Sequence, residues 1–137
     1  MERINLSLAK TLSEAIRRLA EQKGMKIVVA VCDPSGAPVL SEVMDGAFII
    51  SYEVALKKSY TCVAVKMSTA ALGKAVKAGG KLEGLHDDRL VFFGGGEPLY
   101  VGDKLVGGLG VSGGTVEEDT FLASFGAEFF KELTKNQ

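Results

Sequence analysis

The backbone of a glycine-rich segment, residues 90–118, offers the clearest potential for chemistry in this sequence. Nine of the chain's 17 glycines fall between Gly94 and Gly114, which indicates tight turns or a backbone that another group approaches closely. The segment runs into Thr115-Val116-Glu117-Glu118, a Thr-x-x-Glu capping box that opens a helix. The unpaired N–H groups and positive dipole end of such a helix favour a carboxylate or phosphate. We therefore expect an acidic ligand group near Ser112, Gly113, Gly114 and Thr115, with a second backbone-lined rim at Gly95 and Gly96, unless these glycines serve packing alone.

Three side chains could take part in binding such a ligand. Asp45 before Gly46 is either a ligand contact or a turn residue, and Lys57 beside Lys58 either neutralises an acidic ligand or lies on a solvated face. His86 is the single imidazole. It is a candidate axial ligand for an iron or cobalt macrocycle, with Tyr, Met and Cys side chains as the other donors, or else a solvated loop residue. No nucleophile with an adjacent base is indicated by spacing, so no catalytic residue is assigned.

Composition narrows the class of partner. The net charge of −1 gives no reason to expect nucleic acid or an anionic membrane. No apolar run approaches the roughly 20 residues of a membrane span, and the N-terminus lacks the apolar centre of a signal peptide, so we expect a cytoplasmic protein. Cys32 and Cys62 lack CxxC spacing and are expected to be buried thiols, so no protein-only metal site is expected.

Apolar spacing predicts the elements that must position these residues. Helices are expected over residues 7–23, 49–66 and 116–133, with a shorter helix that Ser68 or Thr69 caps and that runs to about residue 78. Strands are expected over residues 27–32, 39–44, 90–93, 99–101 and 104–111, with turns at 33–36 and 102–103. The β-branched run at 27–32 should be a central strand, and Pro38 favours an edge position for the next one. The order α-β-β-α-α-β-β-β-α predicts one α+β domain over residues 1–137, an antiparallel sheet of about five strands covered by helices.

Several motifs in this order resemble the GlcG-like family, which includes glycolate-utilisation accessory proteins, haem-binding HbpS-type proteins and the C-terminal domain of PduO-type corrinoid adenosyltransferases. The resemblance covers residues 6–130 and rests on Met44-Asp45-Gly46-Ala47, on Ala55-Leu56-Lys57-Lys58-Ser59-Tyr60-Thr61 and on the glycine-rich run 107–114. It is similar to the PduO C-terminal type in particular through residues 65–69, 92–99 and 112–119.

The resemblance implies a profilin-like fold, a homo-oligomer built from dimers up to an octamer, and binding of haem or a corrinoid (cobalamin-type) tetrapyrrole in some members. In PduO-type proteins it also implies a link to B12-dependent propanediol or glycerol utilisation. Their adenosyltransferase lies in a separate N-terminal domain, so that activity is not carried over to this chain.

Three functions follow as hypotheses. The first is a non-enzymatic accessory protein that binds haem or a corrinoid. The second is a small enzyme that holds a carboxylate or hydroxy acid at residues 113–115 while Asp45 or His86 moves a proton. The third is a structural oligomer subunit whose glycines serve packing alone.

Overall fold

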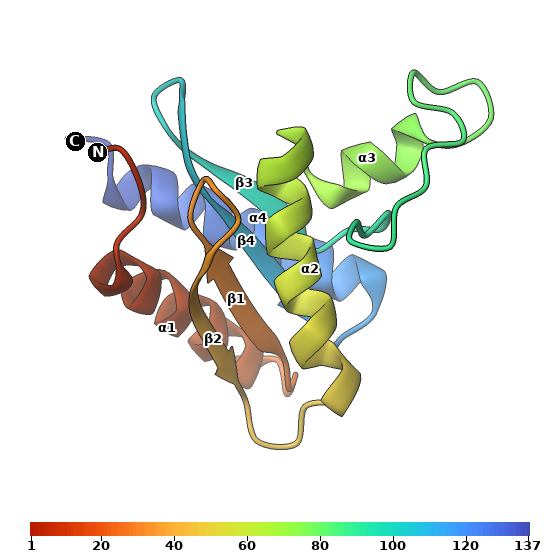
Figure 1. Ribbon diagram of the computed structural model, residues 1–137. Helices are drawn as coiled ribbons and strands as arrows, with labels where there is room; N and C mark the ends of the chain where they lie inside the picture. Colours follow the sequence, from red (N-terminus) through yellow and green to blue (C-terminus); the bar gives the residue numbers. More distant parts are fainter.

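The computed structural model describes residues 1–137 and contains four helices and four strands (Figure 1). In chain order these are α1 (Leu6–Gln22), β1 (Val28–Cys32), β2 (Pro38–Val43), α2 (Ile49–Val65), α3 (Thr69–Ala75), β3 (Gly96–Val101), β4 (Lys104–Ser112) and α4 (Val116–Leu133). No helix is both long enough and apolar enough to span a lipid bilayer.

The strands form one antiparallel sheet in the order β2-β1-β4-β3, so the predicted α+β class is confirmed. Val28 on β1 pairs with Val43 on β2 and with Ser112 on β4, which makes β1 a central strand. The strand that begins at Pro38 lies at an edge, as its proline predicted. The hairpin between β3 and β4 turns at Gly102, whose φ of 61° is the left-handed conformation expected there.

The predicted number of about five strands is wrong, because residues 90–93 do not pair with the sheet. The backbone N–H of Val91 donates instead to Oγ1 of Thr61 on α2, at 3.0 Å. Strand β3 starts at Gly96, three residues before the predicted start. The apolar run at 90–93 is thus a connection that packs against α2.

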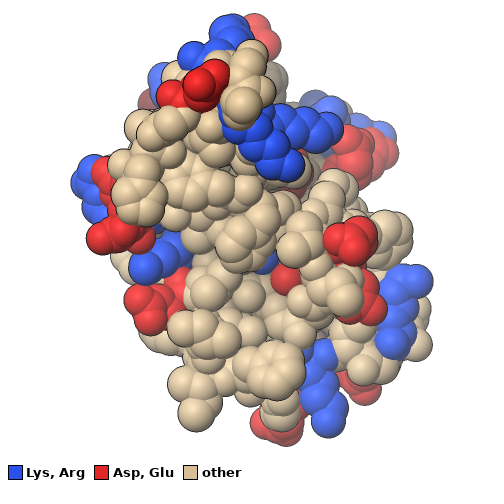
Figure 2. All heavy atoms as spheres, turned by 90° about the vertical axis from the view of Figure 1, so that its right-hand side faces the viewer, with Lys and Arg blue, Asp and Glu red and all other residues tan.

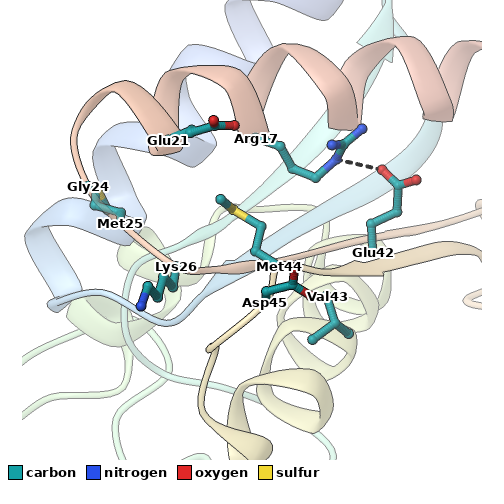
Figure 3. Close-up of a pocket in the computed structure, with 9 residues that line it drawn as sticks. All are labelled: Arg17, Glu21, Gly24, Met25, Lys26, Glu42, Val43, Met44 and Asp45. Atoms are coloured by element: carbon teal, nitrogen blue, oxygen red, sulfur yellow. Dashed lines mark hydrogen bonds and ion pairs between the residues drawn. The ribbon is translucent and has the colours of Figure 1, made fainter.

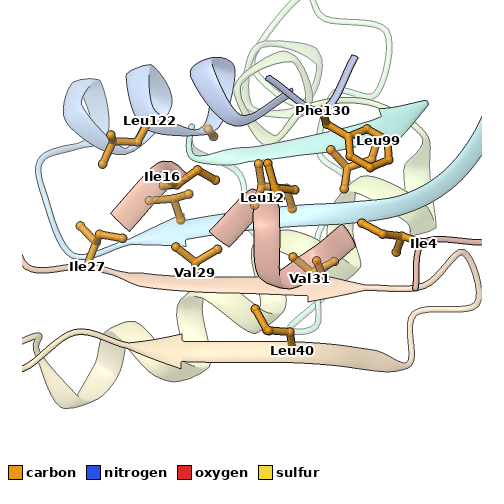
Figure 4. Close-up of a cluster of buried hydrophobic side chains, with 14 of the residues drawn as sticks. Ile4, Leu12, Ile16, Ile27, Val29, Val31, Leu40, Leu99, Leu122 and Phe130 are labelled. Carbon is orange, nitrogen blue, oxygen red and sulfur yellow. The ribbon is translucent and has the colours of Figure 1, made fainter. Parts of the chain in front are cut away.

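Helices cover both faces of the sheet, so the molecule has three layers (Figure 1). Helices α1 and α4 pack on one face, where Ile16, Val29, Leu109 and Leu122 belong to a cluster of 16 buried apolar residues (Figure 4). Helix α2 packs on the other face through Ala55, which contacts Val28 and Ala30. Because both faces are covered, all five residues of β1 are buried.

Helix α2 approaches β4 closely because two glycines of the strand leave room for its backbone. A Cβ added at Gly108 would overlap the carbonyl oxygen of Ser59, and one at Gly110 would overlap that of Ala55. The side chains of α2 that face the sheet are accordingly small, apart from one lysine. Much of the glycine-rich segment therefore serves the contact between helix and sheet.

Candidate functional site

The N-terminus of α4 is the site that the sequence singled out, and the N–H groups of Gly114, Thr115 and Glu118 there are already bonded within the chain. Thr115 and Glu118 form the predicted capping box: the Thr115 N–H donates to Oε1 of Glu118 at 2.9 Å, and the Glu118 N–H donates to Oγ1 of Thr115 at 3.1 Å. The Gly114 N–H donates to Oδ1 of Asp119 at 2.9 Å. A ligand carboxylate would have to displace two carboxylates of the chain, so the geometry does not favour the expected anion site at Gly114 and Thr115.

The expected rim at Gly95 and Gly96 is filled by the chain itself. Both residues are buried, and a Cβ at Gly95 would overlap Nζ of Lys58. A Cβ at Gly96 would lie 2.9 Å from Sγ of Cys62 and 2.7 Å from Cγ2 of Thr69. These two glycines match the packing alternative rather than the ligand-binding one.

The ammonium group behind Gly95 and Gly96 belongs to Lys58, a residue whose burial its sequence neighbourhood did not predict. Lys58 has no exposed surface, and its Nζ donates to the carbonyl of Val111 at 2.8 Å and to Oδ2 of Asp119 at 3.3 Å. The same Nζ lies 5.1 Å from the ring centre of Phe93. Burial lowers the pKa of Lys58, although the charge of Asp119 opposes the change. The ammonium group links α2 to β4 and α4 through these two bonds.

Three of the predicted ligand residues do meet at one surface hollow. Gly46, Gly113 and Gly114 line a groove of about 410 Å³ together with Lys23, Gly24, Met25, Lys26, Phe48 and Glu118. We call it the Lys26 groove. That Gly46, Ser112, Gly113, Gly114 or Thr115 contacts a ligand stays a prediction.

A second groove adjoins it and contains Asp45. Its volume is about 590 Å³, and its lining is Arg17, Glu21, Gly24, Met25, Lys26, Glu42, Val43, Met44 and Asp45 (Figure 3). Arg17 and Glu42 point toward each other across it and form an ion pair of 2.8 Å, and Ser13 donates to the same Glu42 oxygen at 2.6 Å. Three carboxylates face two cations here, so this groove does not favour an acidic ligand.

The structure does not bring Asp45 and His86 together. The loop with Asp45 lies at the bottom of Figure 1, whereas His86 lies in the segment after α3 at the upper right. The His86 side chain is 81% exposed, its Nε2 lies 3.4 Å from Asp88, and it lines neither groove. Neither residue lines the Lys26 groove beside Gly113 and Gly114, so the structure gives no support to proton transfer by Asp45 or His86 to an acid held there.

A third hollow has the character of a ligand pocket. It measures about 320 Å³ and is lined by Cys32, Gly36, Pro38, Leu56, Lys57, Ser59, Tyr60 and Arg89. We call it the Tyr60 cavity. Its exposed wall is largely apolar, unlike the walls of the two grooves. Apolar walls with a few polar groups are typical of small-molecule sites, and the volume is near the lower end of their range of about 300–1,000 Å³.

The β1–β2 turn forms one wall of this cavity and α2 the other. Leu56, Ser59 and Tyr60 share a helix face because they are spaced by three or four residues. Gly36 has a φ of 87°, and a Cβ there would lie 2.8 Å from Cδ1 of Tyr60, so the tyrosine ring rests on bare backbone. Oδ1 of Asp33 holds the turn by accepting from the Ser35 N–H at 2.8 Å and the Ala37 N–H at 3.1 Å.

Two cations stand at the rim of the Tyr60 cavity. Lys57 is half-exposed and forms a loose pair with Glu53 at 3.5 Å. Arg89 is clamped by Asp87, with Nε and Nη2 donating to its two carboxylate oxygens at 3.0 and 2.9 Å. Its Nη1 lies 3.5 Å from the Tyr60 hydroxyl, at the outer limit of a hydrogen bond. The guanidinium holds the pKa of Asp87 well below its usual range.

The sequence identified only one residue of this cavity, Lys57, as a ligand contact. Tyr60 and Arg89 are 29 residues apart, so spacing could not bring them together. The one local signal was the i, i+4 pair of Leu56 and Tyr60 on a helix whose sheet-facing side chains are mostly small. No three His, Cys, Asp or Glu side chains of the chain lie close enough together to hold a metal ion.

Comparison with known proteins relates this geometry to a family. A model for the family described as haem degrading protein HbpS-like matches residues 4–128. An uncharacterized 15.0 kDa protein in the dhaT-dhaS intergenic region of Citrobacter freundii is 38% identical over 133 residues, with 95% of this chain and 94% of that protein covered. The corrinoid adenosyltransferase PduO of the same organism is 38% identical over 115 residues, which cover 82% of this chain but 34% of that protein. Among solved structures, the PduOC:heme complex superimposes with a TM-score of 0.86 at 34% identity and covers 92% of this chain and 94% of that one.

The chain therefore belongs to the HbpS-like family, and the resemblance seen in the motifs is confirmed. It spans about a third of the length of PduO, so the activity of the whole enzyme does not transfer with the match.

Proposed function

We propose that this HbpS-like protein binds haem or a related tetrapyrrole, and that the Tyr60 cavity is the place where it does so. The observation that carries the proposal is a cavity with largely apolar walls and two cations at its rim, in a chain that superimposes on a PduOC:heme complex. A tetrapyrrole has a flat apolar body and, in haem, two propionates at one edge. Leu56, Pro38 and the Tyr60 ring suit the body, and Lys57 and Arg89 suit the propionates.

The donors on both cations are only partly used. Lys57 pairs with the exposed Glu53 at 3.5 Å. Arg89 binds Asp87 through Nε and Nη2, so its Nη1 takes no part in that ion pair. The Arg89 side chain is 71% exposed, so its guanidinium reaches solvent and can donate hydrogen bonds to an incoming carboxylate. At about 320 Å³ the cavity holds part of a macrocycle, and the rest would extend past the rim over α2.

A titration of the purified protein with haemin tests this proposal. We expect a shift of the haem absorption band that saturates at a fixed stoichiometry. Leu56→Glu replaces part of the apolar wall with a carboxylate and should weaken haemin binding at least tenfold, because the macrocycle would have to take water away from a charged group to lie against it. Leu6→Glu adds the same charge at an exposed leucine on α1 and should bind haemin as the wild type does. Absence of the shift in the wild type, or equal binding by both variants, contradicts the proposal.

A corrinoid is the alternative ligand, and the match to PduO supports it. Corrinoids carry amide side chains where haem carries propionates, so the two rim cations favour haem. Tighter binding of hydroxocobalamin than of haemin by the wild type would reverse this preference. It would also support a role in B12-dependent diol or glycerol utilisation.

We also propose a homo-oligomer, formed through the start of α2. Phe48, Ile49, Ile50 and Tyr52 are 69, 96, 62 and 49% exposed, and contiguous apolar surface of this kind often marks an interface. Figure 2 shows the side of the molecule on which this helix start lies; uncharged residues cover most of its middle, and charged residues gather nearer its margins. Sedimentation should give a smaller particle for Ile49→Asp than for the wild type or for Leu6→Asp. A wild-type monomer would refute the proposal.

A further inference from the structure

We propose that Asp87 positions Arg89 so that the mouth of the Tyr60 cavity selects tetrapyrroles that carry free carboxylates. This inference rests on the proposed function and deepens it, because it names the group of the ligand that is recognised and the residue that prepares the cation for it. It concerns only the edge of the ligand at the rim. The observations behind it are the three bonds from Arg89 to Asp87 and the part of the guanidinium that they leave free.

A single carboxylate holds both the backbone and the side chain of Arg89. Oδ1 of Asp87 accepts from the Arg89 backbone N–H at 2.8 Å, the bond of an Asx turn, and the Asp87 carbonyl accepts from the Leu90 N–H at 3.1 Å. These two bonds suffice to form the turn. The bonds from Nε to Oδ1 at 3.0 Å and from Nη2 to Oδ2 at 2.9 Å are additional, and they fix the direction of the guanidinium.

The two side-chain bonds use one edge of the guanidinium and leave another free. Of its five N–H donors, Asp87 takes that of Nε and the one on Nη2 that lies parallel to it, which is the bidentate pattern of arginine with carboxylates. The outer edge keeps one N–H of Nη1 and one of Nη2, again as a parallel pair. Nη1 lies 3.5 Å from the Tyr60 hydroxyl and both residues line the cavity, so this edge stands at its mouth.

A free carboxylate and its ester differ in what they can accept from such an edge. The carboxylate accepts two charge-assisted hydrogen bonds from parallel N–H groups, whereas the ester carries no charge. Lys57, the other cation of the lining, adds charge without a fixed direction, and it already pairs with Glu53 at 3.5 Å. Directed recognition at this rim therefore depends on Arg89, and the bonds to Asp87 set the direction of Arg89.

Asp87 also carries a negative charge, which by itself repels an acidic ligand. The neighbouring Asp88 allows that effect to be measured, because its side chain is 96% exposed, lies 3.4 Å from His86 and has no bond to Arg89. Removing either charge makes the rim more positive by one unit, but only the loss of Asp87 releases the guanidinium. Asp88→Asn is therefore the matched control for Asp87→Asn.

The test measures the affinities of protoporphyrin IX and of its dimethyl ester by porphyrin fluorescence in the same detergent buffer. Neither probe holds a metal, so the comparison reports the carboxylates alone. The wild type and Asp88→Asn should bind the free acid at least about tenfold more tightly than the ester. Asp87→Asn should lower that ratio at least about threefold relative to Asp88→Asn, through weaker binding of the free acid, with the affinity for the ester unchanged within about twofold.

Arg89→Gln tests whether Asp87 acts through the arginine. This variant should lose most of the preference for the free acid. Adding Asp87→Asn to Arg89→Gln should then change the ratio no more than adding Asp88→Asn does, because no guanidinium is left to direct. A merely structural role of Asp87 would weaken the binding of both probes in either background.

The outcomes separate this inference from the proposed function. Failure of the wild type to bind either porphyrin overturns the proposed function, and with it the role of Asp87. Equal affinity of the wild type for the acid and the ester overturns the selection of carboxylates and leaves tetrapyrrole binding in place. The positioning role is overturned if Asp87→Asn matches Asp88→Asn, if it loses affinity for both probes equally, or if it lowers the ratio just as much without Arg89.

Discussion

Replacing Asp119 with asparagine removes the carboxylate that neutralises the buried Lys58 and leaves the rest of the site in place. The ammonium has no exposed surface and would keep only the Val111 carbonyl, at 2.8 Å. The amide oxygen of the introduced asparagine can still accept from the Gly114 N–H, so the start of α4 keeps its bond. The substitution therefore tests the negative charge of Asp119 separately from its hydrogen bond to Gly114.

Two energies bound the loss of stability expected for Asp119→Asn. Removing one partner of a buried ion pair costs about 3–5 kcal/mol in free energy of unfolding. Lys58 can avoid the unpaired charge by losing its proton, which for a lysine of ordinary pKa costs about 5 kcal/mol at pH 7, and that sets a ceiling. We expect Asp119→Asn to lower the free energy of unfolding by about 3–5 kcal/mol, a large part of the 5–15 kcal/mol typical of a domain.

A double-mutant cycle in urea at pH 7 measures this coupling. Lys58→Met alone leaves Asp119 as a buried charge without its cation and should also cost about 3 kcal/mol. The double variant has no buried charge, and the introduced methionine side chain can pack against the ring of Phe93, so it should come within about 1.5 kcal/mol of the wild type. Costs that simply add, with a coupling energy below about 0.5 kcal/mol, would refute the reasoning.

The pH dependence gives a second check of the same pair. The pKa of Lys58 is lowered in the folded state from its usual 10.5, so between the folded and unfolded pKa values the unfolded chain binds the extra proton. Stability contributed by this group therefore rises with pH across that window. Because Asp119→Asn lowers the folded pKa further, its stability deficit should shrink as pH rises from 7 toward 10. A deficit that is constant with pH would mean that Lys58 stays charged in the variant.

Three further predictions concern the frame around the cavity and the sheet. Gly110→Val would drive a side chain into the Ala55 carbonyl and should cost at least about 2 kcal/mol in urea unfolding; a neutral result would show that α2 can move away from β4. Thr115→Ala removes the cap of α4 and should cost about 1 kcal/mol, whereas Thr115→Ser should cost little. Asp33→Asn should be less stable than the wild type at pH 6, and the difference should vanish as pH falls through and below 3.8. Hydrogen bonds from the Ser35 hydroxyl and N–H lower the pKa of Asp33 in the folded state, so the ionised carboxylate stabilises the fold above pH 3.8 and this stabilisation is lost as pH falls below it. A stability difference between Asp33→Asn and the wild type that persists in strong acid would contradict this explanation.

The features that the sequence predicted well are those encoded by neighbouring residues. Helix α4 begins and ends where the capping box and apolar spacing placed it, and Ser68 caps α3 by accepting from the Ala71 N–H. The edge position of β2 followed from one proline. Each of these depends on contacts within a few positions of the chain.

The features that the sequence could not predict depend on distant partners. Lys58 looked equivalent to Lys57, yet one faces β4 with no exposed surface and the other stands at a cavity rim. Their difference is set by Gly95, which leaves the space that Nζ occupies, and by Asp119, 61 residues away. The strand predicted over residues 90–93 is also absent because of a distant partner: the Val91 N–H donates to Thr61 on α2 instead of to a neighbouring strand.

The location of the proposed site follows from how this fold uses its glycines. Gly108 and Gly110 allow α2 to pack closely on β4, so that, Lys58 apart, the helix has small side chains toward the sheet and larger ones on its other faces. Leu56 and Tyr60 are therefore left at the helix surface, where the β1–β2 turn meets them and Gly36 makes room for the ring. The glycine-rich segment thus contributes to a ligand pocket indirectly. It positions the helix whose outer face forms the Tyr60 cavity, while its own N–H groups at Gly114 and Thr115 are bonded within the chain.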